Sequence, residues 1–235
     1  MIMEIIKGFI QRKFVILLAA IVLVFFVLFN AGFFGGDDER IRVTCVGDSI
    51  TYGSGVLKTK EIDSYPAQLQ SKLGTDHVVF NYGLRNATAS AAGDLPYIES
   101  EEYKESLESK PDIVVLMLGT NDTKSYNWDP AEYEAGLKTL VQSYQDLDSK
   151  PTVYLMRSPY AYALDGGEVA EFDIRPAIVE KELGPIVEKV AAETGVEVID
   201  LYSATENQTD LYTDGIHFNA QGYHVISQKV YEILR

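Results

Sequence analysis

A serine, a histidine and an aspartate that could act together stand near opposite ends of the sequence. Ser49 lies in the segment GDSIT, directly after the apolar run 41–46, and Asp214 precedes His217 by three residues near the C-terminus. At that spacing a carboxylate can hold an imidazole in one tautomer, so that its other nitrogen accepts a proton from a serine. Each feature alone has a plainer interpretation, because Asp-Ser after a strand is typical of a turn or helix cap. Together they would supply a nucleophile, a base and an orienting acid.

Two hydrogen-bond donors follow other apolar runs. Asn121 lies in GTND, after the run 113–118, and its side-chain amide can donate to a developing oxyanion. Gly83 ends NYG after the run 78–80, where a glycine lets its backbone N–H approach a substrate closely. The alternatives are a turn-capping asparagine and an ordinary loop glycine.

Alternating strands and helices would position these residues. Predicted helices cover 66–73, 131–147, 178–194 with a bend at Pro185, and a last one capped by Asn219 that runs to Leu234. This alternation predicts a mostly parallel sheet with helices on both faces, whose ligands bind beyond the carboxyl ends of the strands. The predicted strands are Ile41–Val46, Val78–Phe80, Ile113–Leu118, Val153–Met156 and Val196–Ile199.

Four segments in this order resemble the conserved blocks of the SGNH/GDSL hydrolase superfamily. They are GDSIT at 47–51, NYG at 81–83, GTND at 119–122 and DGIH at 214–217, within a resemblance that spans residues 41–235. The resemblance implies an α/β, flavodoxin-like three-layer sandwich around a five-stranded parallel sheet of order 2-1-3-4-5. It also implies a carboxylic ester hydrolase that needs no metal or organic cofactor.

The resemblance assigns a role to each matching residue. It implies Ser49 as nucleophile, His217 as general base and Asp214 as its orienter, with the oxyanion hole formed by the N–H groups of Ser49 and Gly83 and the amide of Asn121. The chain departs from the family pattern at two places, so the resemblance does not specify the shape of the acyl pocket or of the loop after Gly83. The second block often continues Gly-x-Ser-Gly where this chain has Gly-Leu-Arg-Asn at 83–86, and a proline often follows the histidine where this chain has phenylalanine.

The substrate is less well indicated than the reaction. The stretch 121–128 looks like one in family members related to sialate and other carbohydrate O-acetylesterases, and its Tyr126 and Trp128 could stack on a sugar. Arg85 or Arg157 could pair with an acidic sugar, although packing and salt bridging are plainer roles for all four residues. We therefore expect a small-molecule or glycan ester, with acetyl as the acyl group. The alternatives are a lipid esterase, lysophospholipase or thioesterase, a glycan O-acetyltransferase, and a non-catalytic glycan-binding module.

The N-terminal segment predicts attachment to a membrane. Residues 14–36 carry no charge over 23 positions, which is long enough to span a hydrocarbon core of about 30 Å. Basic residues in 1–13 precede this segment and acidic residues in the short tether 37–40 follow it, so a single-pass anchor would leave the N-terminus cytoplasmic and the domain 41–235 outside. The alternatives are a signal peptide that is cleaved to release a secreted protein, and a buried helix of a soluble protein.

Composition excludes some partners and leaves others open. Lys and Arg number 20 against 35 Asp and Glu, and this net charge of −15 argues against binding nucleic acid. Cys45 is the only cysteine, so no intramolecular disulfide can form, and its place in the first strand predicts a buried structural thiol. The sequence does not indicate the oligomeric state.

Overall fold

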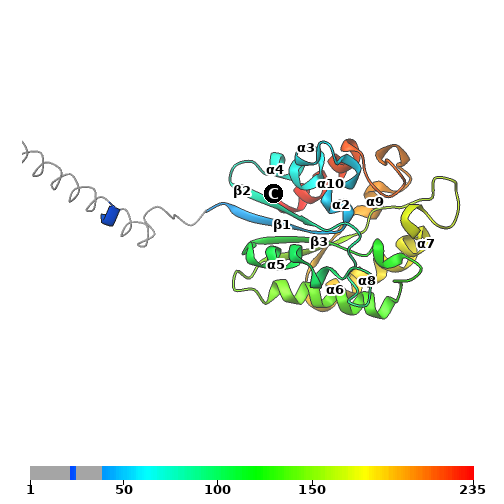
Figure 1. Cartoon of the computed structure of the whole chain (residues 1–235), viewed down its shortest axis with the longest axis horizontal. Helices are drawn as coiled ribbons and strands as arrows, with labels where there is room; N and C mark the ends of the chain where they lie inside the picture. The colour runs from blue at the N-terminus through cyan, green and yellow to red at the C-terminus, as the bar shows by residue number, and fades with distance from the viewer. Residues whose placement is uncertain (1–21, 25–38) are drawn as a thin grey trace, which may run out of the picture. The chain divides into compact units, whose positions relative to one another are not determined.

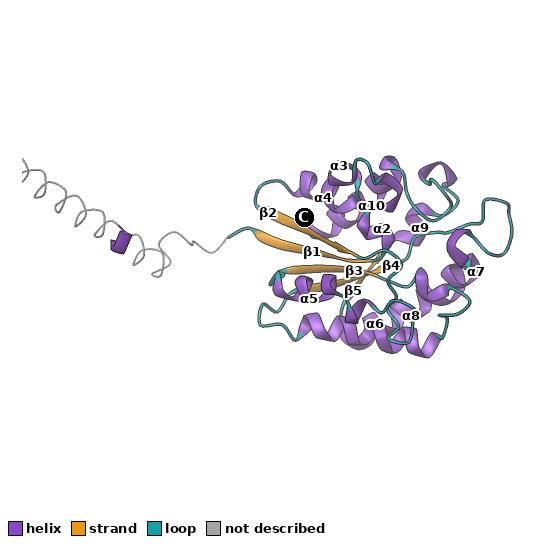
Figure 2. Cartoon of the chain, in the orientation of Figure 1, coloured by secondary structure: helices purple, strands orange, loops and turns teal. Residues whose placement is uncertain are grey.

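The computed structural model describes residues 22–24 and 39–235, and from Arg40 onward the chain forms one compact unit. Its centre is a sheet of five strands in the order β2-β1-β3-β4-β5, in which every neighbouring pair is parallel (Figures 1 and 2). This confirms the predicted sheet and its strand order. The strands are β1 (Ile41–Gly47), β2 (His77–Gly83), β3 (Ile113–Met117), β4 (Thr152–Arg157) and β5 (Glu197–Asp200).

Helices cover both faces of the sheet, as a parallel sheet requires. Side chains alternate along β3, so that Val114 and Leu116 pack on one face while Val115 and Met117 pack on the other. On the first face lie α5 (Glu101–Glu108), α6 (Pro130–Gln145) and α8 (Gly184–Thr194). On the second face lie α2 (Ser49–Tyr52), α4 (Tyr65–Leu73), α9 (Leu201–Thr205) and α10 (Ala220–Leu234), with α3 (Lys60–Asp63) beside them.

The helix ends follow local chemistry that the sequence makes visible. Asp129 caps α6 by accepting hydrogen bonds from two backbone N–H groups, and Pro130 occupies the first turn. The predicted cap of α10 is confirmed, because the Asn219 side chain accepts from the N–H of Gly222. Gly195 ends α8 in the left-handed conformation that glycine adopts without steric cost.

The predicted helix 178–194 is divided into three parts. A single turn, α7 (Pro176–Ile178), leads into a π-helical stretch, Val179–Leu183, which precedes α8. Pro185 has no N–H to donate to the carbonyl of Lys181, so the regular i→i−4 ladder is interrupted next to it. The predicted bend at Pro185 therefore takes the form of a widened turn just before the proline.

Strand β2 extends past its predicted end. It continues from Phe80 through Asn81 and Tyr82 to Gly83, and it is the edge strand of the sheet. An edge strand leaves part of its surface in water, so polar residues are tolerated there and the apolar pattern ends before the hydrogen-bonded strand does.

The predicted membrane anchor, residues 14–36, falls outside the described residues except for a helical turn at Val22–Val24. Within 22–24 and 39–235, no helix is both long enough and apolar enough to cross a membrane. The anchor, its orientation and the location that follows from it remain predictions.

Candidate active site

Ser49 lies at a sharp turn where the first strand meets a short helix. Strand β1 ends at Gly47, and Asp48 caps α2 by accepting a hydrogen bond from the N–H of Ile50 at 2.9 Å. Ser49 is therefore the first residue of α2, at the carboxyl edge of the sheet, and only 9% of its surface is exposed. This turn presents a serine hydroxyl at the edge where ligands of such sheets bind.

Asp48 is a buried carboxylate beside the serine, and the sequence did not assign it a role. None of its surface is exposed, and burial raises the pKa of Asp48 to about 6. Its second oxygen lies 3.5 Å from Nδ2 of Asn121. Burial also raises the pKa of Asp122 to about 6, although that carboxylate accepts hydrogen bonds from the N–H groups of Ala89 and Ser90. Two carboxylates with raised pKa therefore lie under the site.

Replacing Asp48 should change how stability depends on pH. Its pKa of about 6 in the folded chain exceeds the value of about 3.9 for an unfolded one, so the folded state holds this proton more tightly. The carboxylate therefore becomes increasingly destabilising as pH rises through this window. We expect the free energy of unfolding of Asp48→Asn, relative to wild type, to rise by on the order of 2–3 kcal/mol between about pH 4 and about pH 7. Denaturant titrations at several pH values measure this difference, and a pH-independent difference would contradict the expectation.

The histidine and the second aspartate lie in one closed loop before α10. The N–H of Thr213 donates to the carbonyl of His217 at 2.8 Å, which closes the turn. Gly215 has a φ of +83°, and a Cβ there would lie 2.2 Å from the carbonyl oxygen of Tyr162. The loop therefore needs glycine at this position to bring Asp214 back beside His217.

Three side chains form a continuous line of hydrogen bonds. Nε2 of His217 lies 2.9 Å from Oγ of Ser49, and Nδ1 of His217 lies 2.7 Å from Oδ2 of Asp214. The other oxygen of Asp214 accepts the backbone N–H groups of Ile216 and His217 at 3.0 and 2.7 Å. Partial burial raises the pKa of Asp214, but these hydrogen bonds outweigh it, and the pKa is lowered overall. The residues that the sequence predicted as nucleophile, base and orienter are thus brought together.

Asn121 faces the same serine from the loop after β3. It begins a 3₁₀ turn, Asn121–Thr123, and its Nδ2 donates to the carbonyl of Ala87 at 3.1 Å. Its backbone carbonyl accepts from Nδ2 of Asn127 at 3.0 Å. With its contact to Asp48, these hydrogen bonds fix the amide beside the cavity that Asn121 and Ser49 both line.

Gly83, the other predicted oxyanion donor, is not among the residues that line the cavity at Ser49. Its N–H donates to the side chain of Asn81 at 3.0 Å, and a Cβ at this position would lie 2.2 Å from the backbone nitrogen of Tyr52. Position 83 therefore needs glycine, because a side chain there would prevent the close packing of β2 against α2. Asn86, three residues later, lines the cavity at Ser49 and has a φ of +67°. It stands at the fourth position of the block that often reads Gly-x-Ser-Gly, and asparagine is one of the few other residues that tolerate this conformation.

A small cavity opens directly at Ser49, with a volume of about 20 Å³. That is room for about one water-sized group. Arg85, one of the predicted substrate-binding residues, contributes to its wall. The full lining is Ser49, Arg85, Asn86, Thr120, Asn121, Phe172, Ile174, Ile216 and His217.

Phe172 is one of the wall residues that sequence reasoning missed. Its ring contacts the His217 ring edge to face, with the centroids 5.3 Å apart. Phe172 comes from a long connection between β4 and α7, and no motif marks it. Its side chain is 53% exposed, so a substrate at Ser49 would meet this ring.

Three other predicted substrate-binding residues lie outside the cavity lining. Trp128 packs against the core with its ring 5.9 Å from that of Tyr133, and Tyr126 is 63% exposed. Arg157 lies over the ring of Tyr202 at 4.4 Å and 3.7 Å from the carboxylate of Asp200. Packing and ion pairing account for Trp128 and Arg157 in this structure.

A serine, a histidine and an aspartate joined by hydrogen bonds at the carboxyl edge of a parallel sheet form the arrangement that serine hydrolases use. The chain belongs to the GDSL-like Lipase/Acylhydrolase family, whose sequence model matches residues 45–225. Membership of this family agrees with the carboxylic ester hydrolase that the sequence predicts.

Individual relatives agree with this assignment. An acetylxylan esterase of Xylanibacter ruminicola is 33% identical over 211 residues, which cover 84% of this chain and 43% of that protein. A GDSL esterase/lipase of Arabidopsis thaliana is 24% identical over 54% of this chain and 55% of its own length. The chain thus spans about half the length of these curated relatives.

Solved structures share the fold. A carbohydrate acetylesterase family member from Sinorhizobium meliloti superposes with a TM-score of 0.65 at 21% identity, over 83% of this chain and 98% of that one. A lipase/acylhydrolase from Enterococcus faecalis gives a TM-score of 0.62 at 26% identity, over 83% of this chain and 95% of that one.

Proposed function

We propose that this chain hydrolyses short-chain esters, chiefly acetyl esters of carbohydrate, through an acyl-enzyme on Ser49. The observation that carries the proposal is the line of hydrogen bonds from Ser49 through His217 to Asp214 beside a cavity of about 20 Å³. Similarity to an acetylxylan esterase and to a carbohydrate acetylesterase supports the carbohydrate part.

The geometry suits a two-step acyl transfer. In the first step, Nε2 of His217 takes the proton of Ser49 while Oγ attacks the ester carbonyl carbon. The tetrahedral intermediate collapses, the acyl–oxygen bond breaks, and the departing alcohol takes the proton from His217. In the second step, water gives a proton to His217 and attacks the acyl carbon. The bond from that carbon to Oγ breaks, His217 returns the proton to Oγ, and the carboxylic acid and free Ser49 result. Asp214 holds the imidazole and stabilises its charged form throughout.

The negative charge on the carbonyl oxygen needs donors that are already in place. The amide of Asn121 and the N–H of Ser49 are two of them. For the third donor we propose the backbone N–H of Asn86, because Asn86 is a lining residue of the cavity and the N–H of Gly83 already donates to the side chain of Asn81. A left-handed backbone at Asn86 turns its N–H differently from those of the residues beside it.

Acyl-chain length tests the acetyl assignment. Ile174, Ile216 and Phe172 bound the cavity at Ser49, so added carbons would clash or displace the carbonyl from its donors. We expect kcat/KM for p-nitrophenyl acetate to exceed that for p-nitrophenyl octanoate by about tenfold or more. A common alcohol keeps the leaving group constant, so the ratio reports the acyl pocket alone.

The opposite result would identify a different substrate class. In a long apolar channel each buried methylene would contribute about 0.8 kcal/mol, and octanoate would be preferred steeply. An octanoate preference of about tenfold, or about 1.4 kcal/mol, would favour a lipid or thioester substrate and leave the Ser49 mechanism intact. Transfer of acetyl to an added sugar in preference to water would indicate a transferase, and no turnover of any activated ester would indicate a binding module.

A further inference from the structure

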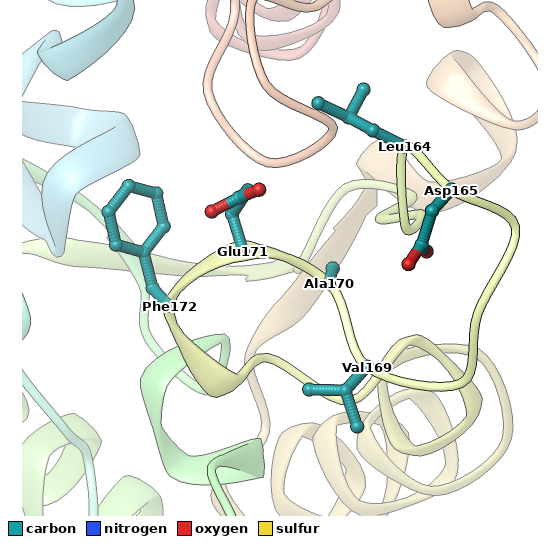
Figure 3. A pocket seen from close by; sticks show the side chains of 6 residues that line it. All are labelled: Leu164, Asp165, Val169, Ala170, Glu171 and Phe172. Carbon is teal, nitrogen blue, oxygen red and sulfur yellow. The ribbon is translucent and has the colours of Figure 1, made fainter.

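A second hollow lies next to the cavity at Ser49 and shares one wall with it. It has a volume of about 230 Å³ and is formed entirely by the connection that follows β4 (Figure 3). Phe172 lines both cavities, so the two adjoin at this residue. The lining is Leu164, Asp165, Val169, Ala170, Glu171 and Phe172.

The lining combines apolar surface with hydrogen-bond acceptors. Leu164, Val169 and Phe172 are between 49% and 61% exposed, which is unusual for three large apolar side chains around one hollow. The carboxylate of Asp165 accepts the N–H of Gly167, whereas that of Glu171 has no hydrogen-bond or ion-pair partner among the described residues. Glu171 is therefore available to accept a hydrogen bond from a ligand.

The hollow is held in a set position relative to the oxyanion donor. Oδ2 of Asp173 accepts from the N–H and the hydroxyl of Ser125 at 2.8 and 2.6 Å, and Arg175 donates to the carbonyls of Thr123 and Lys124. The segment 123–125 begins two residues after Asn121 in the chain. Phe172 and Asp173 both have left-handed backbone conformations, with φ of 61° and 62°, and these contacts hold them there. The wall at Phe172 is thus tied to the loop that carries the amide of Asn121.

We propose that this hollow binds a neutral sugar unit next to the unit that carries the acetyl group, so that the preferred substrate is an acetylated glycan chain. This inference rests on the proposed function. Apolar side chains suit the C–H faces of a sugar ring, and carboxylates accept hydrogen bonds from its hydroxyl groups. Asp165 and Glu171 repel a carboxylate on the ligand, so uronic acids are disfavoured. Pockets for drug-sized ligands have volumes of about 300–1,000 Å³. The hollow is smaller than this, and its volume suits a single sugar ring.

The test compares substrates that do and do not reach the hollow. Acetylated xylotetraose and acetylated xylose serve as the chain and the single unit, and p-nitrophenyl acetate reports the chemistry at Ser49 alone. We expect kcat/KM to be about tenfold or more higher for the tetramer than for acetylated xylose. An acetylated tetramer of galacturonic acid should be hydrolysed less efficiently than the xylose tetramer. Equal values for tetramer and single unit, or a preference for the acidic tetramer, would overturn the proposal.

Substitutions at the hollow locate the effect. Glu171→Gln should lower kcat/KM for the acetylated xylotetraose about tenfold, mainly through KM, because a hydrogen bond to a charged carboxylate is replaced by a weaker one to a neutral amide. The same change should leave kcat/KM for p-nitrophenyl acetate within about twofold of the wild-type value. Glu168→Gln is the matched control, since Glu168 is an exposed carboxylate of the same connection that does not line the hollow. An equal loss on all substrates with Glu171→Gln, or an equal effect of Glu168→Gln on the tetramer, would overturn the assignment.

Binding without turnover separates this proposal from the proposed function. The variant Ser49→Ala cannot form an acyl-enzyme, and unacetylated xylotetraose has no ester to hydrolyse. Titration of this ligand into this variant, by calorimetry or NMR, therefore measures binding alone. Saturable binding that Glu171→Gln weakens would support the subsite even if wild type hydrolysed no ester. No binding at millimolar concentration would overturn the subsite even if small esters were hydrolysed efficiently.

Discussion

Ser49→Ala should lower the turnover of p-nitrophenyl acetate by at least about 10³-fold while the fold is retained. The hydroxyl is the only group of this residue that hydrogen-bonds to Nε2 of His217, at 2.9 Å, and its removal eliminates the covalent route. Alanine keeps the backbone N–H, so part of the oxyanion hole survives and some residual rate over water is expected. Initial rates at saturating substrate measure the loss, and circular dichroism with thermal melting checks the fold.

A neighbouring serine provides the control for this variant. Ser54 lies in the 3₁₀ turn Ser54–Val56 just after α2, and its buried hydroxyl has no hydrogen-bond partner. Ser54→Ala should therefore leave turnover close to wild type. Near-normal hydrolysis by a folded Ser49→Ala would show that Ser49 is not the nucleophile.

Asp214→Asn should lower kcat by about 10³–10⁴-fold. Oδ2 of Asp214 lies 2.7 Å from Nδ1 of His217, and the carboxylate keeps the proton on Nδ1 so that Nε2 can accept the proton of Ser49. An amide can present its NH₂ group to Nδ1 instead, which stabilises the tautomer that cannot act as a base. Its oxygen can still accept the N–H groups of Ile216 and His217, so the loop should keep its shape.

A second aspartate close by in the chain separates this role from a general effect of removing a carboxylate. Asp210→Asn is the control, because Asp210 is an exposed aspartate just ahead of the same loop. If Asp214→Asn retained more than about a tenth of wild-type kcat, Asp214 would not be the orienting residue.

Much of the fold could be predicted because its determinants are local. The apolar run at β3 is covered on both faces, and proline, glycine and asparagine mark helix ends at Pro130, Gly195 and Asn219. Alternation of strands and helices then restricts the sheet to a parallel arrangement, since parallel strands need crossover connections. Strand β2 was predicted too short because an edge strand does not need an unbroken apolar pattern.

The sequence by itself determined which chemical groups the site contains, because Ser49, Asn121, Asp214 and His217 stand at strand ends or in a short closed loop. Only the tertiary structure decided which backbone and wall groups face them. Gly83 packs against α2 while Asn86 reaches the cavity, since the path of that loop depends on contacts with segments distant in the chain. Phe172 reaches His217 because Asp173 and Arg175 bind the loop after Asn121, and side chains so far apart in sequence leave no local pattern. Long-range hydrogen bonds of this kind depend on how the helices, strands and loops pack, and the spacing of motifs in the sequence does not predict them.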